Sequence, residues 1–151
     1  MIQARGGGVS NADIAAIVDR LEQASGTDPL VRSARFNFGA STAVLEVRSR
    51  ERPTEVDRYT FRGHTLVDTT PVRIDVDDDL EATSRPLSTF ALDEVERIAD
   101  EALAEFDASG GYVTGLSLIV PQQTIRVDVE SPRATGTGVF DAEGDFQEFQ
   151  R

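Results

Sequence analysis

The sequence predicts an α+β protein built of two tandem units, each a helix followed by an antiparallel four-stranded sheet (helix-β-β-β-β, repeated). Two observations support this fold class. Helical spacing of apolar residues occurs twice in the chain, and each occurrence precedes segments in which apolar and polar residues alternate. The length of 151 residues suits one domain or two small units.

The first helix is expected over residues 10–25. Ser10 is a preferred N-cap residue, and Asp13 stands three positions later as in a variant capping box. The apolar positions of one helix face follow: Ile14, Ile17, Val18 and Leu21. Gly26 provides the natural end of this helix.

The second helix is expected over residues 92–107. Its apolar positions also recur at helical spacing: Val95, Ile98, Ala99, Ala102, Leu103 and Phe106. Acidic side chains occupy the remaining positions, and Gly110 with Gly111 ends the helix.

A predicted hairpin follows each helix. In the first, the apolar positions are Ala34, Phe36, Phe38, Ala43, Leu45 and Val47. In the second, they are Leu116, Leu118, Val120, Ile125, Val127 and Val129. The apolar faces predict a core that contains Phe36, Phe38, Leu45, Leu118 and Val127.

The two hairpins align at a constant offset of 82 positions, and the two helices at 85. Each unit then closes with an aromatic residue before a glycine turn, in residues 59–63 and 140–144. We interpret this as an internal repeat of pattern. The alternative is coincidence, because a helix followed by a hairpin is common.

The repeat divides the chain into four parts. Residues 1–9 form a flexible tether, residues 10–74 the first unit, residues 75–88 an acidic linker, and residues 89–151 the second unit. The first nine residues contain three glycines and no apolar segment typical of a signal peptide. No stretch of the sequence approaches the roughly 18–20 apolar residues of a transmembrane helix.

The composition excludes several classes of site. The chain has no cysteine, all fifteen basic residues are arginine, and His64 is the single histidine. Thiol nucleophiles, disulfides, cysteine-ligated metals, Schiff-base lysines and the phosphate-binding lysine of a P-loop are therefore excluded, as is any site with two histidines. We predict no cofactor.

The charge is unevenly distributed. Residues 1–74 hold ten Arg and nine acids, a net of +1, whereas residues 75–151 hold five Arg and eighteen acids, a net of −13. Nucleic acid and anionic membranes require a cationic surface, so neither is expected as a partner. The acidic half either keeps the protein soluble or attracts a basic protein partner.

Two short motifs have plain structural interpretations. The acidic run 75–79 lacks the Gly and Glu of an EF-hand calcium loop, because Leu80 and Pro86 stand at those positions, so no metal site is predicted. His64 follows Gly63, which indicates a histidine in a surface turn. A third motif stays open: Arg48, Arg50 and Arg52 alternate, which suits an anion site or the polar face of a sheet.

The second unit resembles the PepSY-like domains, because residues 139–145 (VFDAEGD) look like their hydrophobic–Asp–x–x–Gly turn. The first unit matches less well, since it lacks the Asp. The tandem arrangement is similar to that of β-lactamase inhibitor proteins, whose typical cysteines are absent here, so inhibition of β-lactamase is not carried over. The resemblance implies a non-catalytic module that binds proteins or regulates peptidases, often outside the cytoplasm.

The expected function is therefore binding of another protein without chemistry. The candidate binding residues are Tyr59, Tyr112, Arg126, Asp128 and Glu130. One alternative is a small-ligand-binding domain of the cystatin-like or nuclear-transport-factor-like kind, which requires a mostly apolar pocket of roughly 300 Å³ or more between helix and sheet. Another is a carboxylate-dyad hydrolase, which requires two buried acids close together.

Overall fold

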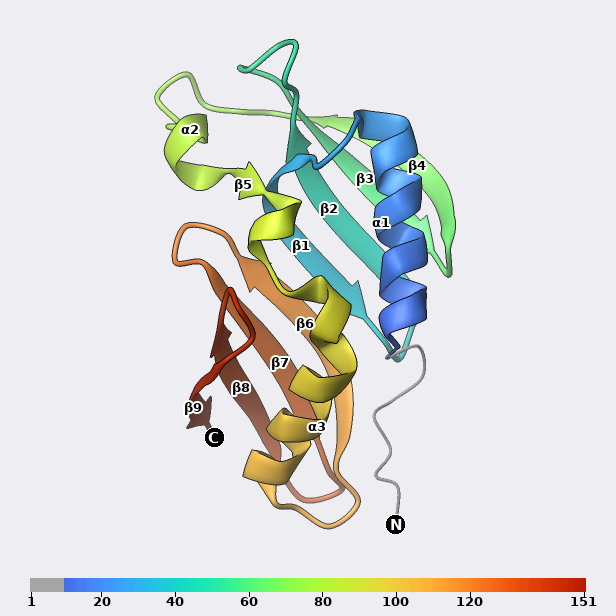
Figure 1. The fold of residues 1–151 in the computed structure, drawn as a ribbon, viewed down its shortest axis with the longest axis vertical. Helices are drawn as coiled ribbons and strands as arrows, with labels where there is room; N and C mark the ends of the chain where they lie inside the picture. The colour runs from blue at the N-terminus through green and yellow to red at the C-terminus, as the bar shows by residue number, and fades with distance from the viewer. Residues whose placement is uncertain (1–9) are drawn as a thin grey trace.

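The computed structural model describes residues 10–151, so the tether predicted at residues 1–9 lies outside the described residues. The chain forms helices packed on one antiparallel sheet (Figure 1). In chain order the elements are α1 (Asn11–Ser25), β1 (Leu30–Asn37), β2 (Thr42–Arg48), β3 (Val56–Arg62), β4 (Thr65–Val72), α2 (Leu80–Thr83), β5 (Arg85–Pro86), η1 (Leu87–Thr89), η2 (Leu92–Glu94), α3 (Val95–Phe106), β6 (Tyr112–Ile119), β7 (Thr124–Glu130), β8 (Thr135–Asp141) and β9 (Phe146–Gln150).

The strands run in the order β4-β3-β2-β1-β6-β7-β8-β9, and the short β5 pairs with β1 beside this path. Every pairing is antiparallel. The α+β class and the order of helix then four strands, twice, are confirmed. The two units do not form separate sheets, however, because β1 and β6 join them edge to edge.

The pairing register confirms that the repeat is real. Ala34 pairs with Leu45 in the first hairpin, and Leu116 pairs with Val127 in the second, at the predicted offset of 82. Each hairpin also has an irregularity at the corresponding place, between residues 31 and 33 and between residues 113 and 115. The strands β3 and β8 correspond at an offset of 79, since Phe61 pairs with residue 43 and residue 140 pairs with residue 125.

The seam between β1 and β6 relates the two halves by a pseudo-twofold axis. Arg35 pairs with Ser117, its own equivalent at the offset of 82, so the axis passes through this pair. The helix N-termini meet near the same axis. The amide of Asn11 donates to Glu96 Oε2 (2.8 Å), and the amide of Glu96 donates to Asn11 Oδ1 (3.1 Å), which are equivalents at the offset of 85.

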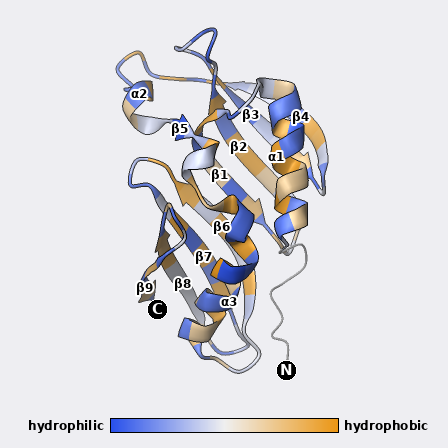
Figure 2. Ribbon diagram, in the orientation of Figure 1, coloured by the Kyte–Doolittle hydropathy of each residue, from blue (hydrophilic) through white to orange (hydrophobic). Residues whose placement is uncertain are grey.

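Both long helices lie on one face of the sheet and cover the core (Figure 1). The five predicted core residues are all buried, with at most 5% of any of them exposed: Phe36, Phe38, Leu45, Leu118 and Val127. The side of α3 turned to the viewer in Figure 2 is mainly hydrophilic. The opposite face of the sheet carries the polar alternates of each strand, and we call it the outer face. No helix among residues 10–151 is long and apolar enough to cross a membrane.

The acidic linker is not a simple spacer. Leu80, Ser84 and Leu87 are buried within it, while the acids at 75–79 stay exposed. The pairing of β5 with β1 holds the segment on the sheet. The acidic linker predicted at residues 75–88 is therefore solvated at its acids but packed on the sheet through its two leucines.

Candidate functional site

Four of the five predicted binding residues lie together on the outer face, on β6 and β7: Tyr112, Arg126, Asp128 and Glu130. The fifth prediction, Tyr59, is wrong. Tyr59 is 8% exposed and belongs to the core, because the alternation along β3 points it inward with Phe61. Burial raises the pKa of its hydroxyl, and the charge of Asp57 adds to the effect. Tyr59 therefore cannot anchor a partner on the outer face.

A hydrogen-bonded network occupies the centre of the outer face. Arg35 Nη1 donates to Asp128 Oδ2 (2.6 Å) and to Ser117 Oγ (2.9 Å), and its Nε donates to Asn37 Oδ1 (3.1 Å). Thr137 Oγ1 donates to the other carboxylate oxygen of Asp128 (3.1 Å). Charge-assisted bonds of this kind are stronger than neutral ones, so the network fixes both charged groups on rigid strands.

Gly115 lets the Arg35 side chain lie against the sheet. A Cβ at Gly115 would stand 2.3 Å from Arg35 Nη2, so any other residue would displace the guanidinium. In the described part of the chain Nη2 donates no hydrogen bond, and it remains available to a ligand. Sequence reasoning missed Arg35, because the alternation within one strand does not reveal that β1 and β6 are neighbours.

An open groove of about 510 Å³ extends from this network over β6, β7, β8 and β9. Tyr112 stands beside it and donates from its hydroxyl to Glu130 Oε2 (3.2 Å). Most of the lining is polar. The lining residues are Arg35, Thr114, Asp128, Val129, Glu130, Thr135, Gly136, Thr137, Gln150 and Arg151. We call this surface the 128–130 groove.

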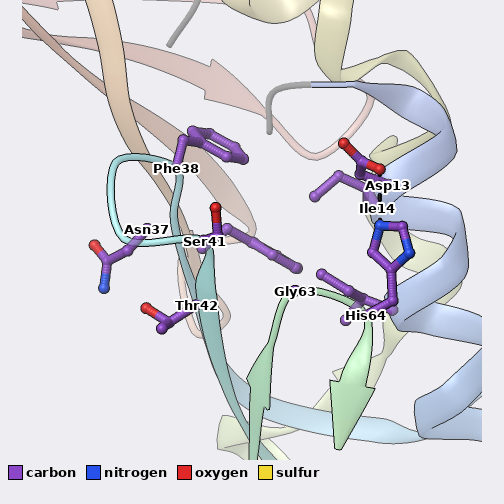
Figure 3. Close-up of a pocket in the computed structure, with 10 residues that line it drawn as sticks. Asp13, Ile14, Asn37, Phe38, Ser41, Thr42, Gly63 and His64 are labelled. Carbon is purple, nitrogen blue, oxygen red and sulfur yellow. Dashed lines mark hydrogen bonds and ion pairs between the residues drawn. The ribbon is translucent and has the colours of Figure 1, made fainter. Parts of the chain in front are cut away.

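His64 has an acidic partner that its position in the sequence did not indicate. Its Nε2 lies 2.7 Å from Asp13 Oδ1, which joins the β3–β4 turn to the start of α1 (Figure 3). The hydrogen bond from the Ser10 side chain, followed by the bond to His64, lowers the pKa of Asp13. No serine hydroxyl among residues 10–151 is hydrogen-bonded to the imidazole, so the pair lacks the nucleophile of a triad.

The cavity beside this pair is small. It encloses about 100 Å³ between α1 and the sheet, and Phe36 and Phe38 line it. Asn37 and Thr42 point away from the cavity in Figure 3. The ligand-binding alternative needed roughly 300 Å³ at this place.

A larger open groove, of about 470 Å³, lies between α1 and the segment after β5. Apolar side chains form most of its lining: Val18, Pro29, Leu87, Phe90 and Leu92. Three of its polar residues, Glu22, Asp28 and Ser88, are hydrogen-bonded to one another, and Asp93 also lines the groove. The Asp28 carboxylate accepts from the amide of Ser88 (2.9 Å) and from its hydroxyl (2.7 Å), and Glu22 accepts from the amide of Asp28 (2.8 Å).

The three alternating arginines do not form an anion site. Arg48 donates to the carbonyl of Pro53, Arg50 to the carbonyl of Asp28, and Arg52 pairs with Glu55. Their guanidinium groups therefore turn to different partners.

Carboxylates approach one another at the β8–β9 turn, where ligand atoms of Asp141, Glu143 and Asp145 lie within 4.8 Å of one another. Asp141 Oδ1 accepts from the amides of Glu143 (3.0 Å) and Asp145 (2.9 Å), so its local role is to shape the turn. The acidic run 75–79 forms no such group in the described chain. No carboxylate is buried among residues 10–151, so the dyad alternative lacks the pair of buried acids it requires.

Comparison with known proteins gives a structural match. A search of family models finds none that matches, and a search of curated proteins finds no match. A protein from Clostridium difficile 630, whose crystal structure is described as that of a "putative lipoprotein", matches 97% of this chain and 95% of its own. The TM-score is 0.64 and the sequence identity is 11%, which shows a shared fold.

Proposed function

We propose that this chain is a non-catalytic module that binds another protein through the outer face. The observation that carries the proposal is the network of Arg35, Asp128, Ser117 and Thr137, which holds charged groups in fixed positions on exposed strands. Interfaces gain specificity from such fixed, complementary charges. The resemblance to PepSY-like domains, which implies binding or peptidase regulation, supports the same class of function.

The charge distribution favours a basic partner. The half of the chain that holds the 128–130 groove has a net charge of −13 over residues 75–151. A field of one sign accelerates encounter with a surface of the opposite sign, and salt screens it over about 8 Å at 0.15 M.

A location in the cell envelope fits this proposal. The structural neighbour is described as a "putative lipoprotein", and PepSY-like domains are often extracytoplasmic. The neighbour supports the location only through its fold.

The test is capture of partners from the native host with three forms of the chain. Ser117→Arg places a bulky cation at the centre of the outer face, and Ala104→Arg places the same side chain on the exposed side of α3. We expect the wild type and A104R to capture the same partner at about 0.05 M salt, S117R to lose it, and capture to fall at about 0.5 M salt. Undiminished capture by a folded S117R would contradict the proposal. Capture that is insensitive to salt would contradict the basic partner.

A second candidate function is binding of a small apolar ligand in the 470 Å³ groove, because its volume and apolar lining fit such a ligand. Titration with an apolar fluorescent dye tests this. Leu92→Asp should abolish saturable dye binding if the groove is the site, and unchanged binding would exclude it.

A further inference from the structure

The internal repeat makes the 128–130 groove equivalent to a surface that the chain itself covers in its first half. The offsets of 82 and 79, read from the strand registers, define the equivalence. The corresponding residues are Thr114 and Arg32, Glu130 and Arg48, and Thr135 and Val56.

In the first half, the segment that precedes α3 lies on this surface. Arg32 Nη2 is 3.6 Å from Asp78 Oδ2, and Arg48 Nη1 donates to Ser84 Oγ (3.4 Å). Leu80 and Val56 are buried (7% and 2% exposed) but lie outside the main core cluster. A helical turn and an extended piece of chain therefore cover this surface.

The same segment also extends the sheet. Its β5 residues pair with Leu30 and Val31 at the start of β1, beyond the end of the β1–β6 pairing. The carbonyl of Pro29 accepts a hydrogen bond from the amide of Leu87 (2.9 Å). The segment therefore uses the backbone edge of β1 as well as its side chains.

In the second half, the described chain leaves the equivalent surface open as the 128–130 groove. Tyr112 and Val113, the equivalents of Leu30 and Val31, pair with β7 on one side. On the other side the pairing with β1 starts only at Gly115, and residues 10–151 provide no strand next to Tyr112 and Val113. Tyr112 is 39% exposed there.

The charge is reversed at the equivalent positions of the two surfaces. The first half presents Arg48 and Arg32, and the segment that covers them contains the acids at 75–81. The second half presents Glu130 in place of Arg48 and the neutral Thr114 in place of Arg32. Two arginines also line the second surface, but Arg35 is paired with Asp128, and Arg151 donates to the carbonyls of Glu105 and Phe106. Glu130 has no ionic partner among the described residues. A segment that fits the second surface should therefore carry a positive charge.

We infer that the 128–130 groove binds an extended peptide segment of a basic partner protein, with an Arg or Lys at Glu130 and the peptide backbone along Tyr112 and Val113. Addition of a strand to an exposed sheet edge is a common mode of peptide recognition. This inference rests on the proposed function and specifies how the partner docks.

The experiment uses two fluorescent ten-residue peptides and the whole chain. One peptide has the sequence of residues 78–87, and the other has Arg in place of its three acids. Glu130→Arg removes the proposed contact, and Glu143→Arg makes the same charge change in an exposed turn outside the groove. Anisotropy gives the affinity, and NMR shifts of the backbone amides give the position of binding.

We expect the wild type and E143R to bind the basic peptide with similar affinity, and E130R to bind it about tenfold more weakly, a difference of about 1.4 kcal/mol. E130R should also gain affinity for the acidic peptide. The amides of Tyr112 and Val113 should shift on binding. Equal loss in E143R and E130R, shifts elsewhere, or no binding of the basic peptide would overturn the inference.

The outcome is separable from that of the proposed function. If the basic peptide fails to bind but S117R still abolishes capture of the partner, the outer face binds the partner in another way. Only the inference of peptide binding in the 128–130 groove is then contradicted. If S117R still captures the partner, the proposed function is contradicted as well.

Discussion

At the scale of single residues, the pseudo-twofold axis explains why Arg35 faces a serine. The axis passes between Arg35 and Ser117, which are directly paired equivalents. Two arginines there would repel each other, because like charges directly opposite on paired strands are destabilising. The small hydroxyl instead accepts from the guanidinium, and Asp128 supplies the opposite charge. The asymmetry at the axis directs Arg35 toward the second half and creates the rim of the groove.

Gly115→Ala tests this arrangement. The new Cβ would collide with the Arg35 guanidinium, which is the flexible end of a long side chain, so Arg35 should move and lose its contact with Asp128. The free energy of unfolding should fall by less than about 1 kcal/mol, because the pair is more than one-third exposed. A crystal structure and denaturant unfolding check both effects. Gly39→Ala is the control, since nothing lies within 4 Å of a Cβ there. An unmoved Arg35 would contradict the argument.

Asp13 gives a pH-dependent prediction. Its pKa is lowered in the folded state, first by the Ser10 hydrogen bond and then by His64. Its contribution to stability is therefore present above the ordinary aspartate pKa and disappears as the pH falls through the lowered value. Asp13→Asn should reduce the free energy of unfolding at pH 6, and the difference from the wild type should shrink below about pH 4. Urea unfolding across this range tests it, and a difference that grows toward low pH would contradict it.

The individual residues show what can be predicted from the chain alone. Burial of Phe36 or Leu118 follows from the alternation along one strand, and the structure confirms it. The contact of Asp13 with His64 spans 51 positions, and no local pattern encodes it. Tyr59 was misplaced because a tyrosine on an amphipathic strand suits either face, and its inward position follows from its β3 neighbours.

At the scale of elements, the segment before α3 shows how composition can conceal structure. Its exposed acids suggested a linker, but two apolar side chains, Leu80 and Leu87, are enough to hold it against the sheet. The helices were easier to predict, because their apolar stripes are long. Ser10 caps the first one as expected, with its hydroxyl accepting from the amide of Asp13 (3.0 Å).

Leu80→Ala should loosen this segment without unfolding the sheet. The substitution removes the buried side chain that anchors α2, so the amides of residues 82–85 should exchange hydrogen faster, because local opening costs less free energy there. Hydrogen–deuterium exchange with mass spectrometry measures this. Exchange in β6 and β7 should stay as in the wild type, and the exposed Val76→Ala serves as the control. Unchanged protection of the amides of residues 82–85 would mean that β5 alone holds the segment.

At the scale of the whole molecule, the pairing of β1 with β6 at the seam joins two half-sheets into one continuous sheet. Without it, β1 and β6 would each present an unpaired edge, which favours aggregation. The seam also sets a half with balanced charge beside a strongly acidic one. The repeat itself could be predicted from the sequence, but the edges that join could not. The seam pairs residues about 80 positions apart, and hydrophobic alternation specifies which face of a strand is buried rather than which strand is its neighbour.

The seam predicts that both halves unfold together. Phe36 is 1% exposed and pairs across the seam with Leu116, so Phe36→Ala should lower the free energy of unfolding by about 3–5 kcal/mol. Because the core is continuous through α1, α3 and both half-sheets, calorimetry should show one transition, with equal calorimetric and van't Hoff enthalpies, in the wild type and in the variant. Val67→Ala, at a half-exposed position on β4, should change the midpoint little. Two transitions in F36A, of which only one has a lower midpoint than the wild type, would show that the halves are independent domains that merely touch at β1 and β6.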